Sequence, residues 1–192
     1  MPITLISPEN EATLTKLLIA FEEESNAHVL HTAFAVQADA EGLHGVASLF
    51  RAIAFAEEIH ANNHARVIRR LGGEAIAEIH AAEVRSTLEN LKQALEGEVY
   101  EIDSMYPDFL AQTRSRDSST ARTFTWALES EKTHARVLSE AIALLEAGKA
   151  NSWISVARDF YVREVCGNLM KATDSERCWA CSYFCKDFEV IR

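Results

Sequence analysis

One feature constrains the fold of this chain more than any other: acidic residues and histidines interrupt the apolar stripe, or seam, along one face of each predicted helix. Glu57 and His60 stand three residues apart in AEEIHA, and Glu131 and His134 repeat that spacing in ESEKTHA. Residues three apart lie one turn apart on the same face of a helix, so each pair can reach one point. A third copy of the spacing, in EGLHG (41–45), is flanked by glycines and is not expected to lie within a helix.

Apolar periodicity and capping signals predict four long helices. The stretch Ser7-Pro8-Glu9 is a typical helix start, and Gly72-Gly73 ends the second helical pattern. The predicted helices cover roughly residues 7–37, 46–71, 86–104 and 117–148. Four such helices favour an all-α bundle, and the longer connection between the second and third is expected to cross one end of it.

Each predicted helix carries metal-type residues in an otherwise apolar seam. Leu17 and Glu24 share a seam in the first helix, and Phe124, Leu128 and Glu131 share one in the fourth. Ionised carboxylates are costly to bury unless they are paired or bind a metal. The inward-facing residues that we interpret as metal ligands are Glu24, Glu57, His60, Glu98, Glu101, Glu131 and His134.

This set of ligands predicts two cations of the iron or manganese type. One Glu from each of two helices, with Glu-x-x-His from the other two, is the ligand pattern of ferritin-like di-iron bundles. Carboxylate and imidazole suit iron or manganese, and the predicted bundle contains no cysteine. Four carboxylates balance two ferrous ions, so Glu101 is surplus and would stabilise a ferric pair. That asymmetry is typical of a redox site.

Charge and composition argue against two classes of partner. The chain has 192 residues and a formal net charge of -10 without a basic stripe, which argues against nucleic-acid binding. The N-terminus lacks a signal-peptide pattern, and no apolar run reaches the length of a membrane span. We therefore expect a cytoplasmic protein with no membrane partner.

The last part of the chain differs in character and contains all four cysteines. From Asn151 onward, aromatic, β-branched and turn residues replace the helical pattern. We expect a bundle over 1–150 followed by a small β-rich metal-ribbon domain over 151–192. Clustered cysteines in a cytosolic chain more often bind metal or do redox chemistry than form disulfides. The candidate ligands for one iron or zinc ion are Cys166, Cys178, Cys181 and Cys185.

Taken together, these motifs resemble those of the rubrerythrin family of non-haem di-iron proteins. The stretches that carry the resemblance are ESNA (24–27), AEEIHA (56–61), GEVYEIDSMYP (97–107) and ESEKTHA (129–135), then DFYV, VCG, CxxC and FEVI in the tail. The resemblance spans nearly the whole chain. It implies a ferritin-like four-helix bundle with two irons, a rubredoxin-like tail and usually a homodimer. It also implies reduction of hydrogen peroxide to water, with electrons that pass through the tail.

The resemblance also implies a role for each matched residue. The principal carboxylate ligands, two of them bridging the irons, would be Glu24, Glu57, Glu98 and Glu131. His134 would hold one iron, while Glu101 and His60 would exchange on the other as the site cycles between ferric and ferrous states. Tyr106 would donate a hydrogen bond. His31 stands where rubrerythrins often carry Tyr, and we expect it to support the site or to pack beside it.

The tail departs from the family pattern in its first metal-binding knuckle. Rubredoxin-type iron is held by two CPxCG knuckles, whereas this chain reads REVCG (163–167) and CWACS (178–182). Arg163 stands where the first cysteine is expected, and Cys185 is a candidate substitute. The tail either holds iron or zinc on three thiolates and a fourth group, or carries free or oxidised thiols. Without this iron the bundle would need an external electron donor protein.

Two other functions stay open from the sequence. One is an O2-using ferroxidase or oxidase, and the other is a non-enzymatic protein that binds or stores iron or senses redox change. The surplus Glu101 favours peroxide chemistry, whereas the impaired knuckle favours the alternatives. Among the remaining residues, His64 is expected to face solvent or a neighbouring helix, and Arg66, Arg69 and Arg70 form a solvated helix face.

Overall fold

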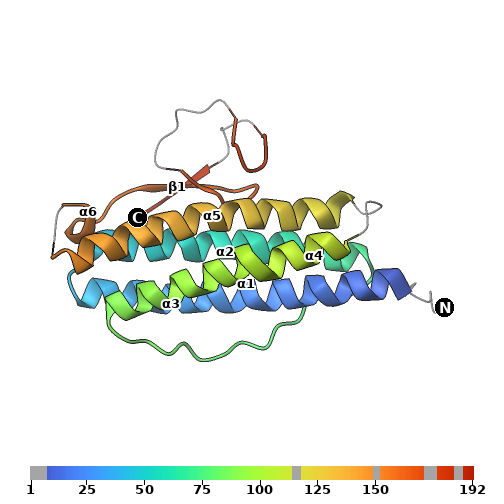
Figure 1. Cartoon of the computed structure of the whole chain (residues 1–192), viewed down its shortest axis with the longest axis horizontal. Coiled ribbons are helices and arrows are strands. Elements are labelled where there is room, and N and C mark those ends of the chain that lie inside the picture. Colours follow the sequence, from blue (N-terminus) through green and yellow to red (C-terminus); the bar gives the residue numbers. More distant parts are fainter. Residues whose placement is uncertain (1–7, 114–117, 149–151, 171–176, 184–187) are drawn as a thin grey trace.

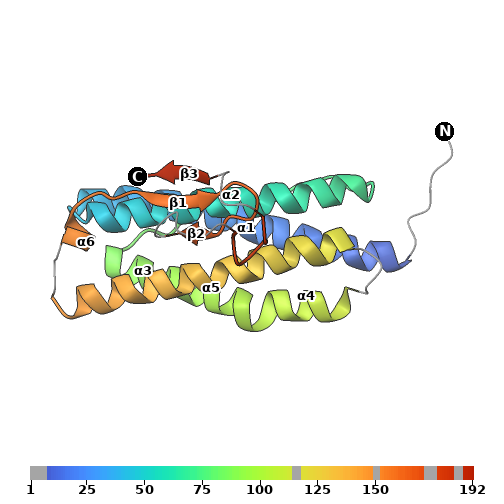
Figure 2. The ribbon, with the colours of Figure 1, turned by 90° about the horizontal axis from the view of Figure 1, so that it is seen from above.

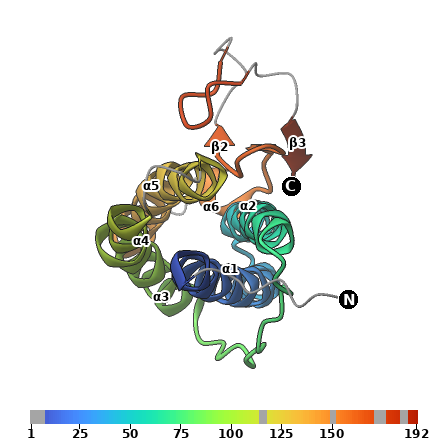
Figure 3. The same ribbon diagram turned by 90° about the vertical axis from the view of Figure 1, so that its right-hand side faces the viewer.

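Four long helices form a bundle, as the sequence predicts (Figure 1). The structure, a computed structural model, describes residues 8–113, 118–148, 152–170, 177–183 and 188–192. The long helices are α1 (Pro8–Ala40), α2 (His44–Arg70), α3 (Thr87–Tyr100) and α5 (Ser118–Glu146). Seen from one end they surround a common centre (Figure 3), so their apolar seams face one another. Within the described residues, none of the helices combines the length and the apolar character needed to cross a membrane.

The connection between α2 and α3 runs along the bundle, which corrects the expectation that it crosses one end. The two helices point the same way, so residues 71–86 return over the length of the bundle beside α1 and α3 (Figure 1; Figure 3). Asn26 of α1 anchors this crossover, because its side chain donates to the Glu78 carbonyl oxygen (2.9 Å) and accepts from the His80 N–H (2.8 Å). One long crossover is typical of ferritin-like bundles.

The third Glu-x-x-His copy contributes to the start of α3 instead of to the interior. Ser86 caps α3 in a capping box with Glu89, in which each side chain accepts the backbone N–H of the other residue. The carboxylate of Glu41 accepts the Thr87 N–H at 3.0 Å. Glu41 and His44 are both exposed, so this pair has a structural role.

The third predicted helix does not end at Ser104, which is a second correction. It continues through a π-helical segment and a further helix, η1 (Glu101–Met105) and α4 (Tyr106–Gln112). The Tyr106 N–H donates to the Glu101 carbonyl oxygen, five residues back, and this wider turn accommodates Pro107 at the start of α4. Glu101 and Tyr106 are therefore both buried although they are five residues apart.

The C-terminal segment forms a small antiparallel sheet on the outside of the bundle, as expected for a β-rich tail. Its elements are α6 (Ser152–Ser155), β1 (Phe160–Arg163), β2 (Leu169–Met170) and β3 (Phe188–Ile191). β1 is the central strand, with Tyr161 opposite Met170 in β2 and Phe160 opposite Ile191 in β3. The sheet contacts α2 and lies over it (Figure 2), on the side of the bundle opposite the crossover (Figure 3).

Two apolar clusters enclose a polar centre in the bundle. One cluster contains Phe34, Phe50 and Leu138, and the other contains Leu17 and Phe124. Along α1, α2 and α5 the acidic residues of the seams lie between these clusters, so apolar side chains close both ends of the centre. The first cluster also includes four residues of the C-terminal segment, Ile154, Phe160, Val162 and Leu169. The sheet therefore shares the core of the bundle.

Candidate metal centre

Six buried ionisable side chains from α1, α2, α3 and α5 converge in the polar centre. They form two overlapping groups: Glu24, Glu57, His60 and Glu131 in one, and Glu57, Glu98, Glu131 and His134 in the other. Within each group the ligand-type atoms all lie within 4.8 Å of one another. Glu57 and Glu131 belong to both groups, so the arrangement offers two adjacent cation positions that share two carboxylates.

The C-terminal segment orients the imidazole of His60. The Nε2–H of this ring donates to the Cys166 carbonyl oxygen at 2.9 Å, which leaves Nδ1 facing the carboxylates. Nδ1 lies 2.8 Å from Glu57, 3.0 Å from Glu131 and 3.4 Å from Glu24. A hydrogen bond that fixes the outer nitrogen in this way is typical of metal-binding histidines.

Gly167 makes the contact between this segment and His60 possible. Its φ of 76° lies in the left-handed region, and an added Cβ would stand 2.3 Å from His60 Nε2 and 3.0 Å from the Ala56 carbonyl oxygen. Glycine therefore lets the chain after Cys166 approach α2 this closely. The sequence matched VCG only as a family motif and did not reveal this contact.

His134 occupies the corresponding place in the second group. Its Nδ1 lies 2.7 Å from Glu131, 3.3 Å from Glu57 and 3.5 Å from Glu98. The His60 and His134 rings stack with their centroids 6.0 Å apart. The two Glu-x-x-His pairs of α2 and α5 thus face each other across the bundle.

Several buried polar atoms of the centre have no hydrogen-bond partner among the described residues. They are both carboxylate oxygens of Glu98 and of Glu131, one oxygen of Glu24, and Nδ1 of His134. Nδ1 of His134 lies 2.7 Å from a carboxylate oxygen of Glu131, so the two groups form a close ion pair. Because unpartnered carboxylates are costly at full burial, these residues fit two divalent cations bound by carboxylate and imidazole.

Burial and neighbouring charges set the pKa values in the centre. Burial raises the pKa of Glu24 and of Glu98 well above the ordinary value of 4.5. For Glu57 burial acts in the same direction, but the two histidines outweigh it and hold the pKa well below 4.5. For His60 burial lowers the pKa, but the carboxylates of Glu131 and Glu24 outweigh it and raise the pKa well above 6.5. Without a cation the centre therefore holds protons that a cation would displace.

Glu101 is buried beside the two groups but belongs to neither. Burial, and repulsion from Glu24, raise its pKa well above 4.5. Glu101 lines a cavity of about 50 Å³ together with His31 and Glu98, and residues of α1, α2 and α3 form its walls. A molecule of the size of water or peroxide fits this volume. The structure thus places the surplus carboxylate at a small cavity next to the ligand groups.

His31 packs against an aromatic ring at the edge of the centre. Its ring stacks on Phe50 with the centroids 6.0 Å apart, and its Nδ1 lies 4.0 Å from Glu57. Burial lowers the pKa of His31 to about 4, so the ring is neutral at neutral pH. This position agrees with a packing or supporting role.

A buried hydrogen-bond chain leads to Glu24, and the sequence anticipated Tyr106 as a donor but not the roles of His64 and Thr123. The Tyr106 hydroxyl donates to Glu24, and the Nε2–H of His64 donates to the Tyr106 oxygen at 3.0 Å. The Thr123 hydroxyl donates to Nδ1 of His64 at 3.1 Å, and burial lowers the pKa of His64 to about 3. His64 therefore faces neighbouring helices rather than solvent. Its spacing of four from His60, which places both on one helix face, was the available signal.

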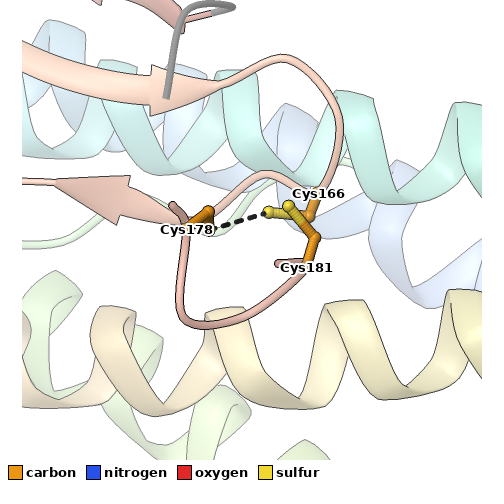
Figure 4. Close-up of side chains that lie close together, drawn as sticks. All are labelled: Cys166, Cys178 and Cys181. Atoms are coloured by element: carbon orange, nitrogen blue, oxygen red, sulfur yellow. Dashed lines mark hydrogen bonds between the residues drawn. The ribbon is translucent and has the colours of Figure 1, made fainter. Parts of the chain in front are cut away.

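Three buried cysteines gather where the C-terminal segment meets the bundle (Figure 4). The sulfur atoms of Cys166, Cys178 and Cys181 lie within 4.8 Å of one another, and those of Cys166 and Cys178 are 3.7 Å apart. Hydrogen bonds from Cys166 and Cys181 lower the pKa of Cys178. Three sulfurs at this spacing can hold a zinc or iron ion with one further ligand. Cys185, the fourth predicted ligand, lies outside the described residues.

The backbone shows that Arg163 occupies the place in the first knuckle that Cys178 occupies in the second. In the second knuckle the Ser182 N–H donates to the Cys178 carbonyl oxygen (2.7 Å), and in the first the Gly167 N–H donates to the Arg163 carbonyl oxygen (2.8 Å). Gly167 and Ser182 both have left-handed backbones, with φ values of 76° and 63°. The two turns therefore correspond residue by residue, with Arg163 equivalent to Cys178. The Arg163 side chain is fully buried.

The fold and the centre together define a class of protein, the ferritin-like bundles that bind two cations between carboxylates and histidines. A family model described as rubrerythrin matches residues 16–142, which is more than half of the chain. This chain belongs to the rubrerythrin family.

Several known proteins are similar to this chain over most of their length. Rubrerythrin-2 of Clostridium acetobutylicum is 32% identical over 178 residues, which cover 92% of this chain and 95% of the relative. Nigerythrin of Nitratidesulfovibrio vulgaris is 32% identical over 172 residues, which cover 88% of this chain and 82% of the relative. A solved structure of fully reduced, all-ferrous nigerythrin has a TM-score of 0.80 and 31% identity, covering 93% of this chain and 86% of that one. A solved structure of a bacterioferritin of Desulfovibrio desulfuricans shares the fold, with a TM-score of 0.71 and 21% identity. The match covers 78% of this chain and 90% of that one.

Proposed function

We propose that this protein is a di-iron peroxidase that reduces hydrogen peroxide to water. The observation that carries the proposal is the pair of overlapping groups, which offers two cation positions that share Glu57 and Glu131. Similar solved structures of nigerythrin are described as mixed-valent and as all-ferrous, which supports iron that changes oxidation state.

The ligand roles follow from membership of the two groups. Glu24 and His60 would hold one iron, Glu98 and His134 the other, and the two shared carboxylates would bridge them. Glu101, which lies outside both groups, would replace His60 as a ligand in the ferric state. Bound ferrous iron would supply the two electrons that reduce one hydrogen peroxide to two waters.

The surrounding residues would admit a small molecule to the centre, exclude bulk water from it and supply protons. The cavity beside Glu101 has room for one small molecule, and the two apolar clusters exclude water from both ends of the centre. Peroxide reduction consumes two protons, and the candidate donors are the Tyr106 hydroxyl and the Glu101 carboxyl, whose pKa is raised by burial. The chain from Thr123 through His64 would return a proton to Tyr106.

Electrons would come from an external donor protein and enter near the cysteine cluster. The hydrogen bond between the Cys166 carbonyl oxygen and His60 supports this route, because it links the cluster directly to a metal-site histidine. A homodimer and a cytoplasmic location, both expected from the sequence, stay predictions.

Ferrous loading without air tests the proposal. Separate portions of the loaded protein are mixed with hydrogen peroxide and with dioxygen, and oxidation of the iron is followed by absorbance. We expect much faster oxidation by peroxide, because the surplus Glu101 and the proton donors suit peroxide reduction. Equal or reversed rates would contradict the peroxidase and support a ferroxidase or a storage protein.

A ligand variant tests the metal centre itself. Glu131 belongs to both groups, so Glu131→Ala should abolish the binding of at least one iron per chain, measured as iron content after anaerobic loading and desalting. Glu129→Ala is the matched control, because Glu129 lies on the same helix and contacts Lys132 instead of the centre. Unchanged iron content in Glu131→Ala would remove this residue from the site.

A further inference from the structure

A hollow of about 300 Å³ lies where α2, α5 and the second knuckle meet, outside the metal centre. Its lining includes three arginines and two aromatic rings, namely Arg66, Arg70, Arg122, Trp126 and Tyr183. We call it the arginine hollow. The sequence predicted a solvated face for Arg66, Arg69 and Arg70, and all three are exposed, but only Arg66 and Arg70 line the hollow.

The charge of the arginine hollow is opposite to that of the chain as a whole. The chain has a net charge of -10, yet none of the described residues that line the hollow is acidic. The Arg66 guanidinium donates to the Asn63 side-chain oxygen at 3.0 Å, and the Arg122 guanidinium lies over the Trp126 ring, 5.6 Å from its centroid. Neither contact neutralises a positive charge. Guanidinium groups bind phosphate with paired, charge-assisted hydrogen bonds, so a phosphate group matches this wall.

The start of α5 adds to the attraction for an anion. Ser119, in the first turn of this 29-residue helix, also lines the hollow. The backbone N–H groups at a helix start and the helix dipole both favour negative charge there. The arginines come from two different helices, so the positive wall is a product of the bundle rather than of one segment.

Two of the residues that line the hollow are aromatic. The Trp126 and Tyr183 rings meet edge to face with their centroids 5.8 Å apart, and half of the Tyr183 surface is exposed. A planar ring of a ligand can pack against such a pair. The volume of the hollow is at the lower end of the range for ligand sites, so it suits a molecule of about mononucleotide size.

We propose that the arginine hollow binds a phosphorylated aromatic molecule of mononucleotide size. Its phosphate would lie between Arg66, Arg70 and Arg122, and its ring would pack against Trp126 and Tyr183. Trp126 also packs against the Cys166, Cys178 and Cys181 cluster, so the ligand would lie next to these cysteines. The proposal does not depend on the peroxidase function.

Binding measurements on the full-length protein at physiological ionic strength test this site. Flavin mononucleotide and adenosine monophosphate are titrated by calorimetry, each beside its dephosphorylated form, riboflavin or adenosine, and beside inorganic phosphate. We expect one of the two nucleotides to bind at least tenfold more tightly than its dephosphorylated form and than phosphate, and the difference between the nucleotides identifies the ring. If neither nucleotide binds at millimolar concentration, or if phosphate alone binds equally well, the proposal is wrong.

Arginine variants locate the binding to the hollow. Arg66→Gln and Arg122→Gln should each weaken nucleotide binding at least tenfold, while the matched control Arg69→Gln, on the same helix as Arg66 but outside the hollow, should change it less than twofold. Circular dichroism confirms that each variant is folded. Because Arg122 contacts Trp126, Arg66→Gln is the cleaner of the two tests. An equal loss in Arg69→Gln would show that only overall charge matters and would overturn the assignment.

Discussion

At the scale of single residues, the hydrogen bond between the C-terminal segment and His60 depends on one glycine. Gly167 allows the Cys166 carbonyl oxygen to accept the Nε2–H of His60, and a Cβ at this position would lie 2.3 Å from that nitrogen. The backbone conformation at Gly167 is also one that other residues rarely adopt. One small residue therefore determines how His60 presents Nδ1 to the carboxylates.

Gly167→Ala should both destabilise the protein and disturb His60. We expect the free energy of unfolding to fall by about 3 kcal/mol, from left-handed strain of about 1 kcal/mol and a clash that costs more. Thermal and denaturant unfolding measure this loss, and iron content reports the effect on the centre. Gly42→Ala is the matched control, since Gly42 has a similar φ of 75° but nothing within 4 Å of an added Cβ. Equal losses in the two variants would show that the contact with His60 carries no energy.

Tyr106→Phe should slow peroxide reduction without loss of iron. The variant removes the hydroxyl that donates to Glu24 and accepts from His64, and with it a candidate proton donor. We expect the rate of peroxide consumption by ferrous-loaded protein to fall at least tenfold, within the range for loss of a general acid. Tyr100→Phe, which changes an exposed tyrosine at the end of α3, should leave the rate unchanged. A rate that matches the wild type would exclude Tyr106 as a donor.

Residue patterns predicted which acidic and histidine side chains gather in the centre, but not the residues that support them. Glu24, Glu57 and Glu131 could be found because helical spacing alone places them in apolar seams. The contacts of His64 with Tyr106 and Thr123 depend on which helices are neighbours, and spacing within one helix does not contain that information. Gly167 was missed for the same reason, because its partner lies more than 100 residues away.

At the scale of elements, the π-helical segment and the two knuckles are the features that local patterns describe poorly. The predicted helix ends at Ser104, shortly before Pro107, yet a single wide turn absorbs the proline and the helix continues to Gln112. Helix propensity does not distinguish these outcomes, because packing of Tyr106 in the core stabilises the wider turn. The other three long helices, in contrast, have strong apolar periods and were predicted with small boundary errors.

The equivalence of the two knuckles predicts that Arg163→Cys restores a four-cysteine metal site. The first knuckle keeps the turn of a ligand-bearing hairpin, so a cysteine at 163 is placed like Cys178. We expect the affinity of the tail for zinc to rise at least tenfold, measured by competition with a chromophoric chelator. Glu164→Cys, which adds an exposed thiol one residue later, should not raise it. The same affinity in Arg163→Cys and the unaltered protein would mean that this position cannot reach the cysteine cluster.

At the scale of the whole molecule, the buried acids of the centre make its metal affinity and its stability depend on pH. Burial raises the pKa of Glu24, Glu98 and Glu101, so in the metal-free protein these groups keep protons that the unfolded chain has lost above pH 4.5. Their contribution to stability is therefore present at low pH and is lost as the pH rises through the raised values. A bound cation displaces these protons and reverses that trend.

Stabilisation by a divalent cation should consequently increase with pH. We expect the rise in unfolding temperature produced by manganese, which suits the same ligands, to be larger at pH 7.5 than at pH 5.5. Each displaced proton contributes about a tenfold gain in affinity per pH unit. Glu131→Ala, which lacks a shared ligand, should show little effect at either pH. A manganese shift that is constant between these pH values would contradict the displacement of protons.

The core shared by the bundle and the tail limits how the cysteine cluster can move. Four apolar side chains of the C-terminal segment pack in the first apolar cluster of the bundle, namely Ile154, Phe160, Val162 and Leu169. Releasing the segment from the bundle would expose them to water. The cysteines are therefore not carried on a swinging tether. In the proposed electron route, the internal step from the cysteine cluster to His60 would take place over a constant gap, at a rate that does not depend on the viscosity of the solvent.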